Sequence, residues 1–471
     1  MEQTDFNTIV NKEKNLSINY TFDSFSISIK IVEKLKLLGY YCPTSIQRKS
    51  IPFALSGRNI MVASKTGSGK TLCFIIPIIE KLQKIKWSSN DLIGGCVIVP
   101  VRELAIQIFS ICKNISSVYF LKVGLLIGGI KRSAPKTYNS IIITTIGRLF
   151  DEILIGKKFT LDFLKILAVD EVDQILDIGF KRSFLQILQF MPSFKQTLLF
   201  SATLTAKLKD IVRLNLTMPL FLYQKTVPKK IQGNLLEKSY LFPKNIYQYY
   251  CFIDSSQKTN FLYSFLVSHF KKKILVFFST TKQVTFFFDV FSKFKLKSPL
   301  FKIYGGLKQV ERTLNYVSFN QASSGVLLAT DIISRGIDLK CVDWVIQFDC
   351  PQNTKSYLHR SGRTGRLSEI GRSLLILTKP ETYFLLLLQK LSVSISNIKI
   401  RSKQWTQITG KIFNLTGKEQ ESGRKGTELY FSAQSAYVTY TRFIFSVQYN
   451  RNPDFNMIEW KKLGENYGLF R

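Results

Sequence analysis

Short apolar runs rich in Val, Ile, Leu and Phe alternate with longer stretches of helical periodicity along most of the chain. Such alternation is typical of βαβ units that surround a parallel sheet. Strands are expected in the first half at residues 59–63, 96–100, 123–127, 141–144, 166–169 and 197–200. A second series is expected at residues 274–278, 301–304, 326–329, 344–348 and 373–377. The pattern therefore predicts an α/β fold with two domains that look like distant versions of one unit.

The periodicity is interrupted between Met218 and Asn234, where prolines and a lysine-rich run occur. A length of 471 residues is also too long for one ordinary hydrophobic core. We predict the following order of segments: a loose N-terminal segment over residues 1–21, a first domain over 22–224, a linker over 225–240, a second domain over 241–395 and a C-terminal extension over 396–471.

The chain carries 66 Lys and Arg residues against 32 Asp and Glu residues, a formal net charge of +34. This excess exceeds what solubility requires and favours a large polyanion such as nucleic acid as partner. A biased composition, with abundant Lys, Phe, Ile and Asn, is the alternative explanation for part of the charge.

No apolar stretch reaches the roughly 18 to 20 residues of a membrane helix, and the N-terminus lacks the features of a secretory signal. We therefore expect a soluble intracellular protein without a membrane partner. The seven cysteines show no metal-ligand spacing, so buried thiols in a reducing compartment are expected.

The segment SKTGSGKT at residues 64–71 follows an expected strand and opens an expected helix, which is the context of a phosphate-binding loop. Gly67 and Gly69 let backbone N–H groups approach phosphate oxygens. Lys70 can reach the β- and γ-phosphates, and the Thr71 hydroxyl can bind Mg²⁺. Ser64 stands in place of the first glycine of the general pattern. The motif alone could be a chance match.

A second motif, DEVD at residues 170–173, directly follows the expected strand 166–169. Ligands of parallel sheets bind at this carboxyl edge. There Asp170 can hold Mg²⁺ through water, and Glu171 can orient and deprotonate the attacking water. Carboxylates at a helix start are also common without catalysis. A phosphate-binding loop about 100 residues upstream favours the catalytic interpretation.

With these elements in place, the chain resembles the DEAD-box RNA helicases over nearly its whole length. The resemblance implies two tandem RecA-like domains that use ATP and Mg²⁺. Phe22 and the segment GYYCPTSIQ at residues 39–47 resemble the Q motif, in which an aromatic ring stacks on adenine and Gln47 reads its edge. The implied nucleotide-binding residues are Phe22, Gln47, Thr66, Gly67, Ser68, Gly69, Lys70, Thr71, Gly336 and Asp338.

The resemblance also implies that both domains grip the sugar-phosphate backbone of one RNA strand and leave base edges nearly untouched. Matching positions occur in PVRELA, GG, TIGR, QVER and the segment that begins ATD. The implied RNA-binding residues are Pro100, Arg102, Gly128, Gly129, Thr145, Gly147, Arg148, Gln309, Arg312, Thr330 and Arg335.

The most specific single motif is YLHRSGRTGR at residues 357–366, whose family counterparts contain arginine fingers that act on the γ-phosphate. In the family, the SAT triplet at residues 201–203 links hydrolysis to strand separation. His359 is expected to couple the RNA and nucleotide contacts, whereas His269 is expected to be structural. The implied catalytic residues are Lys70, Asp170, Glu171, Ser201, Thr203, His359, Arg363 and Arg366.

Three residues depart from the family pattern. Val172 replaces the usual alanine of the box, and its side chain is expected to pack rather than to take part in chemistry. Val101 replaces a threonine and Ile146 replaces a proline within RNA-contact motifs. These two changes predict a weaker grip on RNA than is usual.

Several stretches resemble the nucleolar helicases of small-subunit rRNA processing and snoRNA release, notably residues 87–95, 263–273 and 342–351. Residues 433–442 and the segment that follows resemble a helical C-terminal extension of ribosome-biogenesis helicases; a basic amphipathic helix packed on the second domain is a compatible interpretation. The implied partners are pre-rRNA or snoRNA–rRNA hybrids and ribosome-assembly proteins. We expect a monomer in the nucleus or nucleolus, or otherwise in the cytoplasm.

An RNA-dependent ATPase and helicase is the first hypothesis for this chain. An ATP-gated RNA clamp with little turnover is the alternative, although the retained Lys70, Asp170, Glu171, Arg363 and Arg366 favour the enzyme. A DNA-translocating helicase lacks support, because the Q motif and the 357–366 pattern belong to the RNA-remodelling group.

Overall fold

The computed structural model of the protein describes residues 20–64, 67–88, 92–129, 139–155, 159–201, 218–223, 245–294, 296–333, 339–365, 370–391, 393–398, 400, 405–417, 428–449 and 452–470. The chain divides into two compact units, and the main boundary between them lies between residues 224 and 225. Each unit is built around a seven-stranded parallel sheet.

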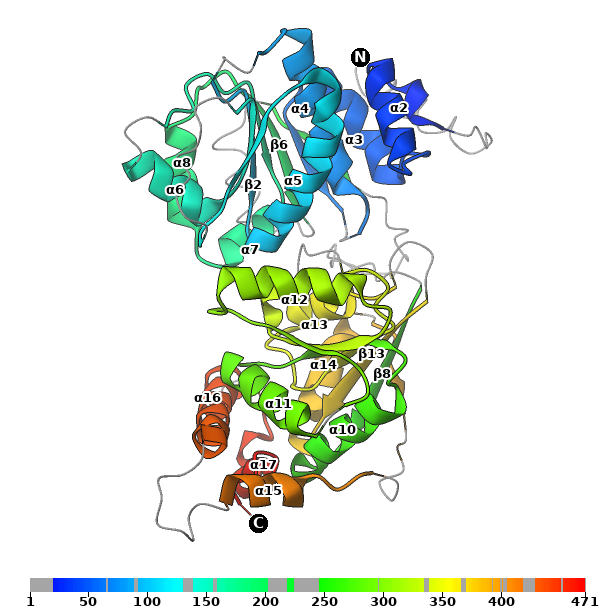
Figure 1. Ribbon diagram of the computed structural model, residues 1–471, viewed down its shortest axis with the longest axis vertical. Coiled ribbons are helices and arrows are strands. Elements are labelled where there is room, and N and C mark those ends of the chain that lie inside the picture. Colours follow the sequence, from blue (N-terminus) through cyan, green and yellow to red (C-terminus); the bar gives the residue numbers. More distant parts are fainter. Residues whose placement is uncertain are drawn as a thin grey trace. The chain divides into compact units, whose positions relative to one another are not determined.

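The sheet of the first unit has the strand order β3-β4-β2-β5-β6-β1-β7. In the view of Figure 1, α6 and α8 lie on one side of this sheet and α3, α4 and α5 lie on the other. The strands are β1 (Ile60–Ala63), β2 (Gly95–Val99), β3 (Val123–Leu126), β4 (Ile141–Thr145), β5 (Ile166–Val169), β6 (Gln196–Ser201) and β7 (Leu220–Tyr223). The helices are α2 (Ile29–Leu37), α3 (Ser45–Leu55), α4 (Lys70–Lys84), α5 (Arg102–Ser116), α6 (Ile146–Ile155), α7 (Val172–Asp177) and α8 (Lys181–Gln189).

The sheet of the second unit has the order β10-β11-β9-β12-β13-β8-β14. Its strands are β8 (Ile246–Phe252), β9 (Lys273–Phe277), β10 (Leu300–Ile303), β11 (Gly325–Ala329), β12 (Trp344–Gln347), β13 (Gly371–Leu377) and β14 (Ser396–Asn397). Its helices are α10 (Lys258–Ser268), α11 (Thr281–Lys293), α12 (Gln309–Gln321), α13 (Thr354–Ser361), α14 (Tyr383–Lys390), α15 (Thr409–Gly417), α16 (Glu428–Gln448) and α17 (Trp460–Glu465).

Strand β13 shows how the second sheet separates two hydrophobic cores. Leu374 and Ile376 pack in the core that contains α10 and α11, whereas Leu375 and Leu377 pack in the core that contains α13 and α14. Successive strand residues point to opposite faces of a sheet, so a strand buried on both faces must be apolar without alternation. This is why continuous apolar runs predicted the central strands.

The predicted fold class is confirmed, and each expected strand is present within two residues of its predicted limits. Strands β7, β8 and β14 were not predicted. Strand β7 lies where prolines interrupt the pattern, and β14 is only two residues long. Strand β8 reads IYQYYCF and mixes exposed and buried positions, so it lacks the apolar run that identified the others.

The C-terminal extension is part of the core of the second unit. Helix α16 buries Leu429, Ala433, Ala436, Tyr440 and Ile444, a spacing of three and four residues that places them on one helix face. Helices α15 and α17 contribute to the same core, and α16 lies beside α11 (Figure 1). Helix α16 is thus amphipathic, but its only charged residues are Glu428 and Arg442.

The prediction that the thiols are buried is correct for five cysteines and wrong for two. All seven cysteines are free, and Cys42 and Cys341 are exposed. Both exposed cysteines lie in turns or loops, whereas four of the five buried ones lie in strands or helices; the fifth, Cys350, is buried in the segment that follows β12. Among the described residues, no helix combines the length and apolar character needed to cross a membrane.

Candidate nucleotide and RNA sites

The motifs assigned to nucleotide binding lie at neighbouring strand ends of the first sheet. The phosphate-binding loop follows β1, Asp170 follows β5, and Ser201 ends β6. Strands β5, β6 and β1 are adjacent, with Ala63 paired to Ser201 and Val169 paired to Leu199. The Ser64 N–H donates to the Ser201 carbonyl at 3.0 Å. The sheet therefore brings three motifs that are far apart in sequence to one carboxyl edge.

The phosphate-binding loop ends at the first turn of α4. Gly67 has φ +74° and Gly69 has φ +86°, left-handed values that favour glycine. Lys70 begins the helix, and its buried ammonium donates to the Ser64 carbonyl at 3.3 Å. Free backbone N–H groups and the dipole at a helix N-terminus attract anions, so this turn suits a phosphate.

The Q-motif segment forms hydrogen bonds with the backbone of this loop. Thr44 and Gln47 form a capping box at the start of α3, in which the Thr44 N–H donates to Gln47 Oε1 at 2.8 Å. The other end of the same amide, Gln47 Nε2, donates to the Gly69 carbonyl at 2.9 Å, and Thr44 Oγ1 donates to the Ser68 carbonyl at 2.8 Å. A side chain at position 69 would lie 2.8 Å from Gln47 Nε2, which is a second reason for glycine there. The Phe22 ring is buried and packs edge-on against Phe25.

Two adjacent carboxylates occupy the end of β5. Burial raises the pKa of Asp170, and the Lys70 ammonium and a hydrogen bond from the Glu171 N–H partly offset this effect. Glu171 has φ +51° and is the N-cap of α7. A left-handed conformation is unusual for a residue with a side chain and clusters at functional sites.

A hydroxyl and a carboxylate are the oxygen donors that Mg²⁺ prefers, and Mg²⁺ usually keeps several waters and bridges to substrate phosphates. Thr71 lies in the first turn of α4, and Asp170 lies at the same edge of the sheet. The residues present therefore fit a magnesium–nucleotide complex.

The motifs assigned to RNA lie on the strands next to these. Strand β2 adjoins β5 and β4 adjoins β2, and Val99 of β2 is paired with Thr145 of β4. Pro100 and Arg102 follow β2, whereas Gly147 and Arg148 lie in the first turn of α6 after β4. A Cβ atom at Gly128 would lie 2.8 Å from Arg102 Nη2, so the two motifs are in close proximity. Arg148 forms an ion pair with Glu152 at 2.5 Å.

The three family departures are buried apolar side chains. Ile146 of α6 and Val172 of α7 lie in one hydrophobic core, and Val101 is nearly as buried. Val172 therefore packs, as predicted. Ile146 is the first residue of α6, where a proline would also be tolerated because the first N–H of a helix has no internal partner.

In the second unit, one arginine joins two of the assigned motifs. Arg360 donates to both carboxylate oxygens of Asp331, from Nε at 2.5 Å and from Nη2 at 2.9 Å. Thr330 and Asp331 directly follow β11, and Arg360 lies on α13. Both His359 and Arg363 are buried, and Arg363 Nε donates to the His359 carbonyl at 3.3 Å. Gln309 and Arg312 are buried in the first turn of α12.

Some predicted site residues lie outside the described part of the chain: Thr66, Thr203, Arg335, Gly336, Asp338 and Arg366. His269, expected to be structural, stacks on Phe265 with ring centroids 4.1 Å apart and accepts or donates a hydrogen bond at the Phe265 carbonyl. Arg360 and Asp331 had no role assigned from sequence. Their place inside recognised motifs was the only available signal, because no local pattern reveals a contact between residues 29 positions apart.

The fold and these sites define a class of protein with two tandem RecA-like α/β domains. Residues 44–211 match the DEAD/DEAH box helicase family, and residues 257–368 match the helicase conserved C-terminal domain. A protein named ATP-dependent RNA helicase HAS1, from Phaeosphaeria nodorum, is 37% identical over 433 residues, which are 90% of this chain and 69% of that protein. The chain belongs to the DEAD/DEAH box helicase family.

Other similar proteins extend beyond this chain. Human "Probable ATP-dependent RNA helicase DDX10" is 34% identical over 94% of this chain and 50% of that protein. The chain spans about half the length of this and the other first-matched curated relatives. A solved structure of Mss116p bound to ssRNA and AMP-PNP has a TM-score of 0.80 at 24% identity, over 96% of this chain and 92% of that chain, which is evidence of the shared fold.

Proposed function

We propose that this protein is an ATP-dependent RNA helicase that clamps single-stranded RNA and separates short duplexes or remodels RNA–protein complexes. The observation that carries the proposal is the order of the strands in the first sheet and the motifs that follow them. The strands β4 and β2 present the RNA-contact motifs, and the adjoining strands β5, β6 and β1 present the nucleotide motifs. A change at the nucleotide is thereby one strand away from residues assigned to RNA.

The proposed roles follow from where the side chains lie. Backbone N–H groups of Gly67 to Lys70 hold phosphate oxygens, and Lys70 exchanges its contact with the Ser64 carbonyl for the β- and γ-phosphates. Thr71 and Asp170 hold Mg²⁺, which supplies positive charge to the phosphates when bound. Glu171 orients the attacking water and accepts its proton, and Arg363 with Arg366 stabilises negative charge on the transferred group.

The limits proposed for the helicase domains are residues 22–224 and 241–395, with the extension over 396–471. In the proposed cycle ATP binding favours a closed arrangement of the domains on RNA, and hydrolysis with phosphate release reopens it. The names of the relatives and the ssRNA bound in the Mss116p structure support RNA as the polymer.

We further propose pre-rRNA or a snoRNA–rRNA hybrid as the natural substrate and the nucleolus as the compartment. This part rests on the resemblance of residues 87–95, 263–273 and 342–351 to nucleolar helicases. Ribosome-assembly proteins are the proposed partners, and the protein is proposed to act as a monomer.

Strand separation tests the proposal directly. A short RNA duplex with a single-stranded overhang is mixed with the protein and ATP, and release of a labelled strand is followed over time. The proposal expects release with ATP and little release with Lys70→Ala, which lacks the phosphate contact. ATP-dependent retention of RNA without strand release or ATP turnover would support the clamp alternative instead.

A further inference from the structure

A group of lysines lies at the amino edge of the first sheet, where β5 and β6 begin. The two strands are paired from their first residues, and Lys165 and Lys195 directly precede them. The Gln196 N–H donates to the Lys165 carbonyl at 3.0 Å. The Lys81 ammonium, in the last turn of α4, donates to Gln196 Oε1 at 3.1 Å. Three lysines from separate elements therefore meet at one place.

These lysines lack counter-charges. Within the part of the chain that the structure describes, no carboxylate lies at ion-pair distance from any of the three ammonium groups. The Lys195 ammonium donates to the Pro192 carbonyl at 3.0 Å, and the Lys165 ammonium lies 5.8 Å from the centroid of the Trp87 ring. Burial, and then the charge of Lys165, lower the pKa of Lys81, and burial lowers the pKa of Lys195. The group thus repels its own charge.

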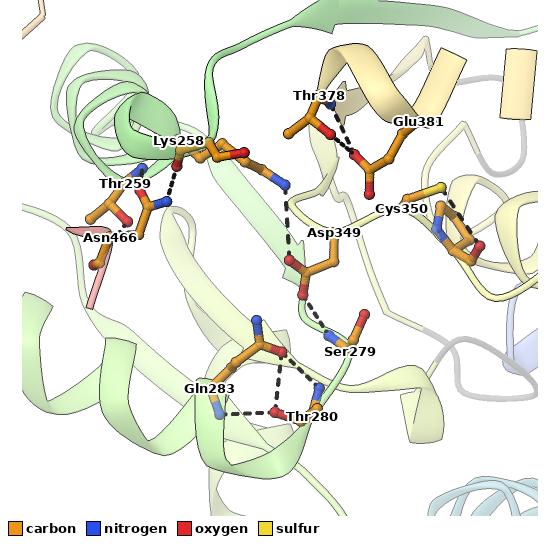
Figure 2. A network of polar contacts seen from close by, with 12 residues as sticks. Lys258, Thr259, Ser279, Thr280, Gln283, Asp349, Cys350, Thr378, Glu381 and Asn466 are labelled. Atoms are coloured by element: carbon orange, nitrogen blue, oxygen red, sulfur yellow. Dashed lines mark hydrogen bonds and ion pairs between the residues drawn. The ribbon is translucent and has the colours of Figure 1, made fainter. Parts of the chain in front are cut away.

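A lysine of the second unit shows the opposite case, in which the chain supplies the counter-charge. The Lys258 ammonium lies 4.0 Å from Asp349 Oδ1, and Asp349 Oδ2 accepts a hydrogen bond from the Ser279 N–H at 2.8 Å, as Figure 2 shows. An ammonium withdrawn from water is costly unless such a partner replaces its hydration. Lys81 and Lys195 are half-buried, and a bound anion would supply the partner that Lys258 finds within the chain.

Two phenylalanine side chains adjoin the lysines in sequence and are exposed to water. Phe194 directly precedes Lys195 and is fully exposed, and Phe163 lies two residues before Lys165 with 51% of its surface exposed. An apolar ring left in water adds nothing to the stability of the fold. Asp162 is the only described carboxylate in the segments 84–88, 159–165 and 190–195. The exposed rings and the positive charge together favour a polyanion that also has apolar faces.

Single-stranded RNA has both properties. It carries a phosphate charge at each nucleotide, and its unpaired bases have faces that stack on aromatic side chains. Surfaces that combine positive charge with aromatic rings are typical of proteins that bind single strands without reading their sequence. An acidic protein segment would neutralise the lysines but offers no comparable stacking faces for the rings.

The amino-edge patch comprises Lys81, Phe163, Lys165, Phe194 and Lys195. We propose that this patch binds a single-stranded segment of the RNA substrate, with the lysines on phosphates and the rings on bases. The inference rests on the proposed function, because it takes RNA as the polymer. The nucleotide motifs and the RNA-contact motifs of the first unit follow the carboxyl ends of the strands of this sheet, so the patch lies at the opposite edge. It retains RNA that flanks the segment held at the carboxyl edge.

The first test measures how binding of a long oligouridylate to the full chain without nucleotide depends on KCl concentration. Lys165→Gln/Lys195→Gln is compared with Lys411→Gln/Lys461→Gln, which removes the same charge from exposed lysines of α15 and α17. The log–log salt slope should become shallower by about 1.4 in the patch variant, about 0.7 for each lost phosphate contact. The control should keep the wild-type slope. Equal slopes in the two double variants would overturn the inference.

The second test concerns the rings. Phe194→Ala should weaken binding of the same oligouridylate roughly fivefold or more, the usual effect of removing one stacked aromatic side chain. Phe120→Ala is the control, because Phe120 is 89% exposed but lies before β3, at the far end of the strand order. It should bind RNA as the wild type does. Wild-type affinity in Phe194→Ala would overturn the assignment of the patch to single-stranded RNA.

Labelled polyglutamate tests the alternative ligand. It should bind no better to the wild type than to Lys165→Gln/Lys195→Gln. Polyglutamate binding that is lost in this variant, while oligouridylate binding is kept, would assign the patch to an acidic protein segment and overturn the inference. Failure of the proposed function gives a different result, namely a wild type whose ATP hydrolysis does not respond to RNA. Normal stimulation together with equal RNA binding by all variants overturns the patch alone.

Discussion

Single side chains in the first unit are placed by backbone geometry as much as by sequence. Glu171 adopts φ +51° directly after a buried strand, and its own N–H donates to Asp170 Oδ1 at 2.9 Å. The neighbouring Asp170 is buried, with a raised pKa. A strained residue beside a buried carboxylate is unfavourable for folding alone and is typical of a site selected for chemistry.

The finger role of Arg363 predicts a large loss of turnover when the guanidinium is removed. In Arg363→Ala we expect RNA-stimulated ATP hydrolysis to fall by a factor on the order of 10³. RNA binding without nucleotide should remain close to wild type, because the change does not touch the residues assigned to RNA. Steady-state ATPase and fluorescence anisotropy with labelled RNA measure the two quantities. Wild-type turnover in this variant would remove Arg363 from the site.

Thiol chemistry tests the placement of the cysteines. Burial raises the pKa of Cys73, Cys112 and Cys251 to about 12, so these thiols are protonated as well as inaccessible at pH 8. The thiolate is the reactive form. Iodoacetamide in excess should therefore modify Cys42 and Cys341 in the native protein, as read by mass spectrometry of peptides, and all seven cysteines in denaturant. Rapid native labelling of Cys73 would contradict the buried packing of α4.

At this scale the sequence could predict residues that belong to contiguous motifs. Lys70, Asp170 and Glu171 were identifiable because chemistry requires them at fixed places after strands. The Arg360–Asp331 contact could not be predicted, because the two residues are 29 positions apart in sequence and neither carries a local pattern that names the other. The exposure of Cys341 likewise depends on a turn rather than on its residue type.

Helix α3 shows how one element serves both stability and the site. Gln47 uses its carbonyl oxygen to close the capping box and its amide nitrogen to hold the Gly69 carbonyl. The cap thus fixes the first turn of α3. The Thr44 and Gln47 side chains of this cap in turn hold the phosphate-binding loop through hydrogen bonds to the Ser68 and Gly69 carbonyls. The assignment of Gln47 to the adenine edge stays a prediction.

The two ends of the Gln47 amide can be separated by substitution. Gln47→Glu keeps an oxygen that can accept from the Thr44 N–H but loses the donor to Gly69, and it places a negative charge beside the loop. We expect a small change in melting temperature and a clear rise in KM for ATP. Gln47→Ala removes both contacts and should in addition destabilise the protein by about 1 kcal/mol, the usual contribution of a helix cap. Unchanged KM in Gln47→Glu would show that neither the loop contact nor the adenine contact matters.

Elements buried on both faces of a sheet were the easiest to predict, since their apolar runs have no competing explanation. Three strands were missed for other reasons, since the edge strands β3 and β10 were predicted. Strand β7 directly follows a proline, β14 is only two residues long, and the half-exposed positions of β8 dilute its apolar pattern. The helices of the extension could be recognised by resemblance and by the apolar spacing of α16. Their inclusion in the core depends on side chains of α10 and α11 that only the folded unit brings together.

On the scale of the whole molecule, the protein carries a formal net charge of +34, and its proposed function includes binding the phosphate backbone of RNA. Binding of single-stranded RNA should then weaken with salt, with a log–log slope of about −0.7 for each phosphate neutralised. Titrations of labelled RNA at several KCl concentrations give this slope. A response that is flat with salt would contradict backbone gripping and favour compositional bias as the origin of the charge.

The central claim, that RNA and ATP hydrolysis are coupled in this chain, is tested most directly by the rate of ATP hydrolysis with and without single-stranded RNA. Glu171→Gln is the matched variant, because it keeps the size of the side chain and removes the proposed base; single-stranded DNA is the competitor. We predict strong stimulation by RNA, little by DNA, and loss of the stimulated rate in Glu171→Gln. Tight ATP-dependent RNA binding without hydrolysis, or a stimulated rate that survives in Glu171→Gln, would contradict the account.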